Sequence, residues 1–147
     1  MKIAIASDHA GFDMKLLAIN IIKDLGFEII DLGPTTNNSV DYPDYGKLVA
    51  KGVSNGAYDK GILICGTGLG MSYVANKYES VLAALCTNEF MAKMARAHNN
   101  ANILVLGARV LGDDLATSII NVFFNTPFSN EERHNRRLNK ILDLKKN

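Results

Sequence analysis

The sequence has almost no excess of charge of either sign. Its 147 residues include 16 Lys and Arg and 15 Asp and Glu, which gives a formal net charge of +1. This balance argues against nucleic acid as the main partner, because such proteins carry a basic footprint. No apolar run approaches the roughly 20 residues that a membrane-spanning helix needs. Met1 and Lys2 lead directly into a short apolar run without the pattern of a signal peptide, so we expect a cytoplasmic protein.

Cysteine and histidine are scarce. Cys65 and Cys86 form no close pair, and with only three histidines they offer no cluster with the spacing of metal ligands. The sequence therefore predicts no zinc site. Repeats and low-complexity linkers are also missing, and the length suits one domain with a substantial core. We expect a single domain over residues 1–147 that is an enzyme or a binding protein.

What the sequence does contain is a strand, a glycine loop and a helix in direct succession. Residues 62–64 are an Ile-Leu-Ile run typical of a strand buried on both faces, Cys65 ends it, and glycines follow at positions 66, 68 and 70. Such a turn directs backbone N–H groups and the positive end of a helix at whatever lies above the strand. A thiol placed there should ionise more easily than a free thiol. The same pattern also fits a small buried hydrophobe beside tightly packed glycines.

The rest of the chain alternates predicted strands with predicted helices. Thr87 is expected to cap the fourth helix, and Ser129 with Glu132 to form a capping box for the last one. The alternation predicts an α/β fold, a three-layer, Rossmann-like αβα sandwich around a five-stranded parallel sheet. The predicted strands are residues 2–7, 27–31, 61–65, 81–85 and 101–106, and the helices are 12–25, 43–54, 71–77, 87–98, 113–124 and 130–144.

The carboxyl ends of parallel strands share one edge of the sheet, where ligands of such folds bind. That edge would carry Asp8 and His9, then Asp31, the loop 65–70, residues 86–88 and Arg109. A nicotinamide site would use an acid at Asp31, but residues 7–11 lack the glycine fingerprint, so Asp31 is interpreted as a loop or cap residue. A nucleoside-triphosphate loop is absent too, since no glycine precedes Lys-Ser or Lys-Thr.

These residue types suit a phosphorylated sugar. A thiolate can remove a proton next to a carbonyl, and the N–H groups of residues 66–70 could hold the enediolate that forms. Arg133 and Arg137 stand four apart on one helix face and could bind phosphate, although a solvated basic face has the same spacing. His98 at a helix end and His9 beside Asp8 each fit a structural role as well as a catalytic one.

Motifs along essentially the whole chain resemble ribose-5-phosphate isomerase type B, a family shared with galactose-6-phosphate isomerase subunits. The resemblance implies an isomerase of the pentose phosphate pathway that interconverts ribose 5-phosphate and ribulose 5-phosphate through an enediolate, without a cofactor or metal ion. The motifs are Ser-Asp-His-Ala-Gly at 7–11, Asp-Tyr-Pro-Asp-Tyr at 41–45, Ile-Cys-Gly-Thr-Gly-Leu-Gly at 64–70, Ala-Asn-Lys at 75–77, His-Asn-Asn-Ala-Asn at 98–102, Gly-Ala-Arg at 107–109 and Arg-His-Asn-Arg-Arg at 133–137.

The resemblance also implies a role for each matching residue. Cys65 would be the base that moves a proton between C1 and C2, and Thr67 would assist proton movement at the sugar oxygens. His98 would open the furanose ring, with Asp8 as a helper. The enediolate would be held by Gly66, Thr67, Gly68, Leu69 and Gly70, the sugar contacted by Tyr42 and Asn99, and the phosphate bound by His9, Arg109, Arg133 and Arg137.

Three positions near the loop bear on this assignment. Some relatives use a glutamate base at the position of Met71, which methionine cannot replace, so Cys65 is favoured. Leu69 and Tyr73 depart from the usual smaller aliphatic residues and would either reshape the sugar pocket or pack the helix. A six-carbon 6-phosphate, such as galactose 6-phosphate or allose 6-phosphate, stays an alternative substrate, and a non-catalytic sugar-phosphate sensor is a second alternative.

The predicted topology separates two of the catalytic groups. Cys65 ends a parallel strand, whereas His98 ends a helix that runs back to the opposite edge of the sheet. A strand of about five residues spans ~17 Å, too far for side chains to bridge. We therefore expect the last helix to reach a partner chain and each site to be built from two chains, in a homodimer or a dimer of dimers.

Overall fold

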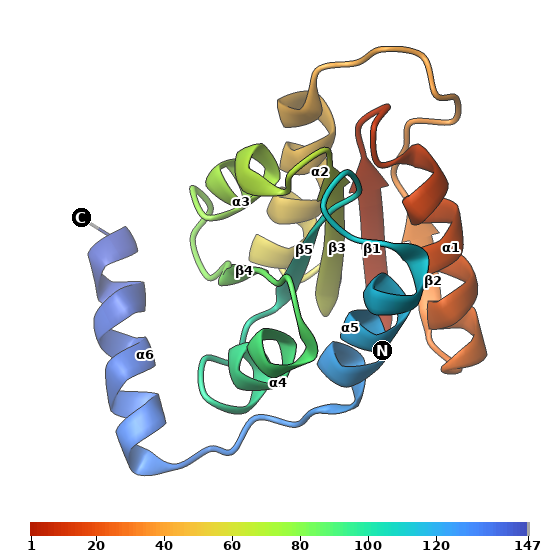
Figure 1. The fold of residues 1–147 in the computed structure, drawn as a ribbon. Coiled ribbons are helices and arrows are strands. Elements are labelled where there is room, and N and C mark those ends of the chain that lie inside the picture. Colours follow the sequence, from red (N-terminus) through yellow and green to blue (C-terminus); the bar gives the residue numbers. More distant parts are fainter. Residues whose placement is uncertain (147) are drawn as a thin grey trace.

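The computed structural model describes residues 1–146 of the chain (Figure 1). Strands and helices alternate as predicted, and Asn147, the last residue of the expected domain, lies outside the described part. The elements are β1 (Lys2–Ser7), α1 (Phe12–Asp24), β2 (Glu28–Asp31), α2 (Tyr42–Ser54), β3 (Lys60–Cys65), α3 (Leu69–Ala75), β4 (Ala83–Leu85), α4 (Glu89–Ala97), β5 (Ile103–Gly107), α5 (Asp113–Asn125) and α6 (Glu132–Lys145).

The strands form one five-stranded sheet in the order β2-β1-β3-β5-β4, and every neighbouring pair is parallel. The central strand β3 pairs Gly61 with Ile103 and Cys65 with Gly107 of β5. Residues 61–65 are all buried, because helices cover both faces of a parallel sheet and leave no polar side. The predicted parallel sheet is confirmed.

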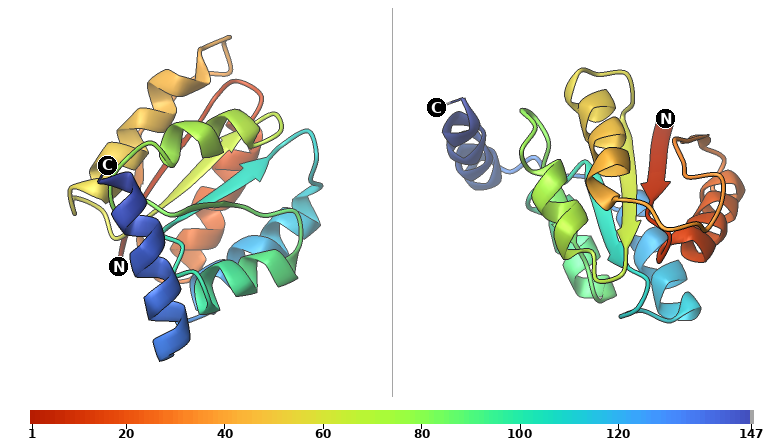
Figure 2. Two further views of the ribbon diagram at one scale, coloured as in Figure 1. Left: turned by 90° about the vertical axis from the view of Figure 1, so that its left-hand side faces the viewer. Right: turned by 90° about the horizontal axis from the view of Figure 1, so that it is seen from above.

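Two apolar layers flank the sheet, because successive side chains of a strand point to opposite faces. Ala4, Leu63 and Val105 belong to a buried cluster with residues of α2 and α3, whereas Ile5 and Ile64 pack with residues of α1, α4 and α5. Figures 1 and 2 show the sheet between these helices. The predicted three-layer sandwich is therefore present. Among residues 1–146, no helix has the length and apolar character needed to cross a bilayer.

Two predicted helix caps are wrong. Asn88, not Thr87, caps α4, since its Oδ1 accepts a hydrogen bond from the Met91 N–H at 2.8 Å. The expected capping box at Ser129 does not form, because α6 begins at Glu132 with Glu131 as the capping position and no side-chain cap. Asn130 adopts a left-handed backbone with φ 56°, which keeps the chain from entering the helix at Ser129.

Helix α6 stands apart from the layered body, at the end of an extended segment that follows α5 (Figures 1 and 2). It is attached at both ends. The Ser129 N–H donates to the Ala97 carbonyl at 2.9 Å near its start, and near its end the Lys145 ammonium donates to the carbonyls of Tyr78 and Val81. Leu144 is 75% exposed, so α6 keeps an apolar side chain in solvent.

Candidate active site

Cys65 lies at the centre of the carboxyl edge of the sheet, as the last residue of β3. Its side chain is buried, and the Gly68 N–H donates to Sγ at 3.2 Å. Gly68 makes this contact with a left-handed backbone, φ 81°, as the residue that precedes α3. A Cβ at this position would also lie 2.4 Å from Cδ1 of Leu85. Glycine is therefore required at position 68 both by conformation and by space.

The glycine loop is tied to the end of β5. The Ala108 N–H donates to the Cys65 carbonyl and the Arg109 N–H to the Gly66 carbonyl, each at 2.9 Å. The Arg109 side chain lies over Gly66, since a Cβ there would be 3.4 Å from Nη1 of Arg109. Thr67 is exposed at the tip of the loop, and its Oγ1 accepts a hydrogen bond from the Leu69 N–H at 3.3 Å. The structure thus brings a guanidinium, a hydroxyl and the thiol together.

The loop after β1 packs on the other side of the same strand end. The Asp8 N–H donates to the Ile64 carbonyl at 3.1 Å, and the buried Asp8 carboxylate accepts from the Gly11 N–H at 3.1 Å. His9 follows, and its Nδ1 accepts from the Val40 N–H at 3.2 Å. Because a backbone N–H can only donate, Nδ1 of His9 is unprotonated and the ring carries its proton on Nε2. His9 therefore offers Nε2–H as a donor.

Tyr42 completes this edge from the start of α2. Its ring lies against Gly70, where a Cβ would be 2.5 Å from Cζ and 2.9 Å from the hydroxyl oxygen. Asp31, predicted to be a loop or cap residue, is the last residue of β2. Its carboxylate accepts from the Gly33 N–H in the following loop and pairs with Lys15, which is fully buried. The edge therefore gathers residues from four loops around Cys65.

Four predicted site residues lie elsewhere. His98 is the capping residue at the end of α4, and Asn99 follows it. The Gly61 N–H at the start of β3 donates to the carbonyl of Asn102, so this turn lies beside the amino end of the strand. The rise from Gly61 to Cys65 is about 13 Å. Within one chain His98 and Asn99 are therefore at the opposite edge from the thiol, as the topology predicted.

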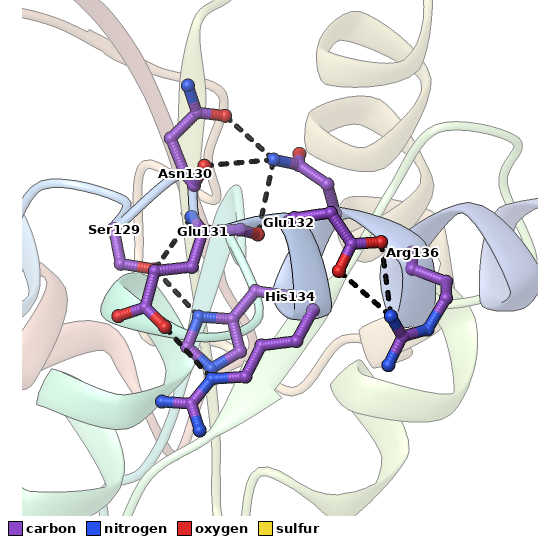
Figure 3. A network of polar contacts seen from close by, with 8 residues as sticks. Ser129, Asn130, Glu131, Glu132, His134 and Arg136 are labelled. Atoms are coloured by element: carbon purple, nitrogen blue, oxygen red, sulfur yellow. Dashed lines mark hydrogen bonds and ion pairs between the residues drawn. The ribbon is translucent and has the colours of Figure 1, made fainter.

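Arg133 and Arg137 lie on the same side of the sheet as His98, not beside Cys65. Both are exposed on the first turns of α6, beside His134, whose ring stacks on that of His98. Arg133 pairs with Glu131 at 2.9 Å, and Arg136 pairs with Glu132 at 2.9 Å (Figure 3). Such exposed pairs contribute little to stability, so they leave the basic side chains able to exchange partners.

An apolar hollow of about 300 Å³ lies between β4 and α4. Two of its lining residues are exposed, Phe90 at 71% and Met91 at 40%. Cys86 also lines it, and burial raises the pKa of the Cys86 thiol to about 12. The lining residues are Ala84, Leu85, Cys86, Phe90, Met91, Met94, Ala95 and Asn99. Among residues 1–146, no three His, Cys, Asp or Glu side chains are grouped so that they could hold a metal ion.

The three residues near the loop differ in burial: Met71 lies in the core, whereas Leu69 and Tyr73 are exposed. Met71 is fully buried, and its Sδ would lie 2.8 Å from a Cβ on Gly46, so it belongs to the core. Leu69 is 47% exposed and Tyr73 is 65% exposed. Of the two alternatives for these residues, packing into the core is not what the structure shows, because both side chains are exposed; an effect on the sugar pocket stays a prediction.

Sequence reasoning missed the residues that hold the turn around His98. Arg96 is buried, and its Nη1 donates to Oδ1 of Asn100 at 3.0 Å and to the Ala101 carbonyl at 2.5 Å. Burial lowers the pKa of the Arg96 guanidinium. Asn102 receives the Leu82 N–H on its Oδ1 and donates to the Ser80 carbonyl. The three asparagines within residues 99–102 could have indicated such a turn, since asparagine side chains often form hydrogen bonds with nearby backbone groups.

The chain resembles known proteins over nearly its whole length. The family model described as Ribose/Galactose Isomerase matches residues 3–141. YwlF, a putative sugar phosphate isomerase of Bacillus subtilis (strain 168), is 46% identical over 144 residues, which cover 97% of this chain and 96% of that protein.

Two solved structures superpose closely. Ribose-5-phosphate isomerase B of Clostridium thermocellum is 49% identical, with a TM-score of 0.96 and coverage of 99% of this chain and 98% of that one. Ribose-5-phosphate isomerase B of Mycoplasma genitalium, with bound ribulose-5-phosphate, is 42% identical, with a TM-score of 0.94 and coverage of 99% and 96%. The likeness therefore includes the complete sheet and all of its edge loops.

Proposed function

The chain belongs to the ribose/galactose isomerase family, and from this premise we propose that it interconverts ribose 5-phosphate and ribulose 5-phosphate. The observation that carries the proposal is the thiol of Cys65, held by the Gly68 N–H where the loops after β1, β3 and β5 meet. The two solved relatives support the five-carbon sugar, since both are ribose-5-phosphate isomerases and one of the two was determined with bound ribulose-5-phosphate.

The proton transfer assigned to Cys65 runs between adjacent carbons. The thiolate takes the proton from C2 of the open-chain aldose, and the electron pair moves to form the enediolate. Thr67 assists the transfer of the O2 proton to O1, and the thiol then returns its proton to C1. An N–H group that donates to sulfur is matched to a thiolate, because hydrogen bonds to charged acceptors are the stronger ones.

The ring of the sugar must open before this step, and we assign ring opening to His98. A proton leaves O1 for the imidazole, the C1–O4 bond breaks and O4 takes up a proton. Asp8 is assigned as a helper because its buried carboxylate lies at the Cys65 edge. His9 and Arg109 at that edge, with Arg133 and Arg137, are proposed to bind the phosphate.

We further propose that each site is shared between two copies of the chain, in a homodimer or a dimer of dimers. His98 and Cys65 lie at opposite edges of one sheet, about 13 Å apart along β3 alone, so one sugar cannot meet both within one chain. Dimer interfaces bury apolar surface, and this chain exposes such surface at Phe90 and Met91 of α4. Helix α6, which protrudes from the layered body, would extend the interface.

A mixing experiment tests the shared site and the assignment of Cys65 together. Cys65→Ala and His98→Asn chains are each expected to lose nearly all turnover, and are then unfolded together and refolded as mixed dimers. One site of a mixed dimer would carry both defects and the other none, so activity should rise toward half the normal value per mixed dimer. A control mixture of Cys65→Ala with Asp8→Asn should not recover, because both residues belong to the same edge.

Two outcomes contradict parts of the proposal. No recovery in the first mixture would remove the shared site while leaving the isomerase assignment intact. Near-normal conversion of ribose 5-phosphate by Cys65→Ala would remove the thiol base. Comparing kcat/KM for ribose 5-phosphate with that for galactose 6-phosphate and allose 6-phosphate tests the sugar, and a preference for either six-carbon substrate would overturn that choice.

A further inference from the structure

His134 is the one histidine whose ring is almost completely buried. It projects from the first turns of α6, and its Nδ1 lies 2.7 Å from Oγ of Ser129 (Figure 3). Ser129 is itself fixed, because its N–H donates to the Ala97 carbonyl at 2.9 Å. The His134 ring is therefore anchored to the end of α4 through two successive hydrogen bonds.

The buried ring stacks on His98. The two ring centroids are 4.3 Å apart, and the planes differ by 31°. His98 is only half-buried, and its N–H donates to the Met94 carbonyl at the end of α4, so its own helix restrains its backbone but not its ring. The stack on His134 is the ring contact that the structure gives His98.

The charged groups around His134 favour its neutral form. Burial lowers the pKa of His134, and the neighbouring His98, Arg133 and Arg137 act in the same direction, whereas Glu131 opposes them. Two imidazoles at this separation are not both protonated readily, because like charges disfavour each other. The surroundings therefore favour a neutral His134 ring beside that of His98.

We propose that His134 is a positioning residue that acts through His98: anchored by Ser129, it fixes the plane in which the His98 imidazole meets the sugar. The inference rests on the proposed ring-opening role of His98. Small displacements of a reacting group are costly, and misplacement by about 1 Å can reduce a rate by about 100-fold. His134 would thus control ring opening without contacting the bond that breaks.

Ring opening can be measured separately from isomerisation. In a Cys65→Ala background the proton transfer between C1 and C2 is blocked, but opening and closing of the ring still interconvert the two ribofuranose anomers of ribose 5-phosphate. NMR exchange spectroscopy gives that rate. Binding is measured with ribulose 5-phosphate, which cannot close a furanose ring because its O5 carries the phosphate.

In this background His134→Leu removes the stack, His134→Phe keeps an aromatic ring, and Ser129→Ala removes the anchor alone. We expect His134→Leu to slow anomer exchange by about 10- to 100-fold, with unchanged affinity for ribulose 5-phosphate. His134→Phe and Ser129→Ala both keep a ring and lose the anchor, so their rates should fall between that of His134→Leu and that of the parent. Arg136→Ala, on the exposed face of the same helix, is the matched control and should exchange anomers at the parent rate.

The outcomes separate the inference from the function on which it rests. If His98→Asn lowers exchange but the folded His134 and Ser129 variants do not, the positioning role is overturned and ring opening by His98 stands. Equal losses in exchange and in ribulose 5-phosphate affinity would also overturn it, since they indicate general packing of α6. If His98→Asn leaves exchange unchanged, both the ring-opening role and the positioning role fall. Ribulose formed by Cys65→Ala would appear in the same spectra and would count against the thiol base alone.

Discussion

Replacement of Arg96 by methionine tests how the turn that carries His98 is held. Arg96 is only 7% exposed, and its guanidinium donates to Asn100 and to the Ala101 carbonyl and lies 5.7 Å from the centre of the Phe123 ring. A hydrogen bond from a charged donor contributes about 1.5–3 kcal/mol, so two give about 3–6 kcal/mol. The ring contact adds about 0.5–2 kcal/mol.

Removing the charge does not lose all of this stabilisation, because the buried ion also carries a desolvation cost of several kcal/mol that disappears with it. Methionine fills a similar volume but leaves the Ala101 carbonyl without its donor, which costs about 1–3 kcal/mol. We therefore expect Arg96→Met to lower the free energy of unfolding by about 2–4 kcal/mol. Because the turn bears His98 and Asn99, turnover of ribose 5-phosphate should fall as well.

Urea denaturation followed by circular dichroism measures the first effect, with an unchanged m-value showing that the folded and unfolded states are comparable. Lys93→Met is the matched control, since Lys93 is exposed on the same helix and such substitutions change stability by about 0.5 kcal/mol or less. A midpoint for Arg96→Met equal to that of the control would refute the reasoning, as would full activity in a destabilised variant.

Three further predictions concern the Cys65 edge and the basic helix. Iodoacetamide should inactivate the enzyme, with protection by ribose 5-phosphate. Cys86→Ala should be inactivated at the same rate, because burial raises the pKa of the Cys86 thiol to about 12; resistance of Cys86→Ala to inactivation would place the reactive thiol at position 86 instead. Gly68→Ala should lose most activity in steady-state assays, since φ of 81° and a contact of 2.4 Å with Leu85 both oppose a Cβ, and normal turnover would contradict the loop geometry. Arg137→Ala should raise KM for ribose 5-phosphate by about 10-fold or more, as expected for a lost charged hydrogen bond, with far less effect on residual turnover of free ribose; equal losses with both substrates would make the arginine structural.

The sequence determined the layers and the edge at which Cys65 lies. Strand and helix periods are local properties, so the runs at residues 2–7 and 62–64 predicted buried strands correctly. Once the strands are parallel, connectivity alone places every carboxyl end at one edge, and it sends the helix before His98 to the other. For this reason the separation of His98 from Cys65 could be predicted without coordinates.

Tertiary structure alone decided which polar side chains are buried and what they hold. Lys15, Arg96 and His134 stand in sequence patterns that equally suit exposed residues, and each is buried through contacts with residues that other elements supply. Their partners include Asp31 for Lys15 and His98 for His134, and such distant pairs leave no periodic signal. The helix caps also could not be predicted from the sequence pattern. Ser129 and Thr87 have suitable side chains for caps, but the backbone enters the helix one or two residues later. The place of α6 depends on contacts of the same kind, because an extended segment could lead it in many directions. The hydrogen bond of Ser129, the stack on His98 and the contacts of Lys145 fix one of them.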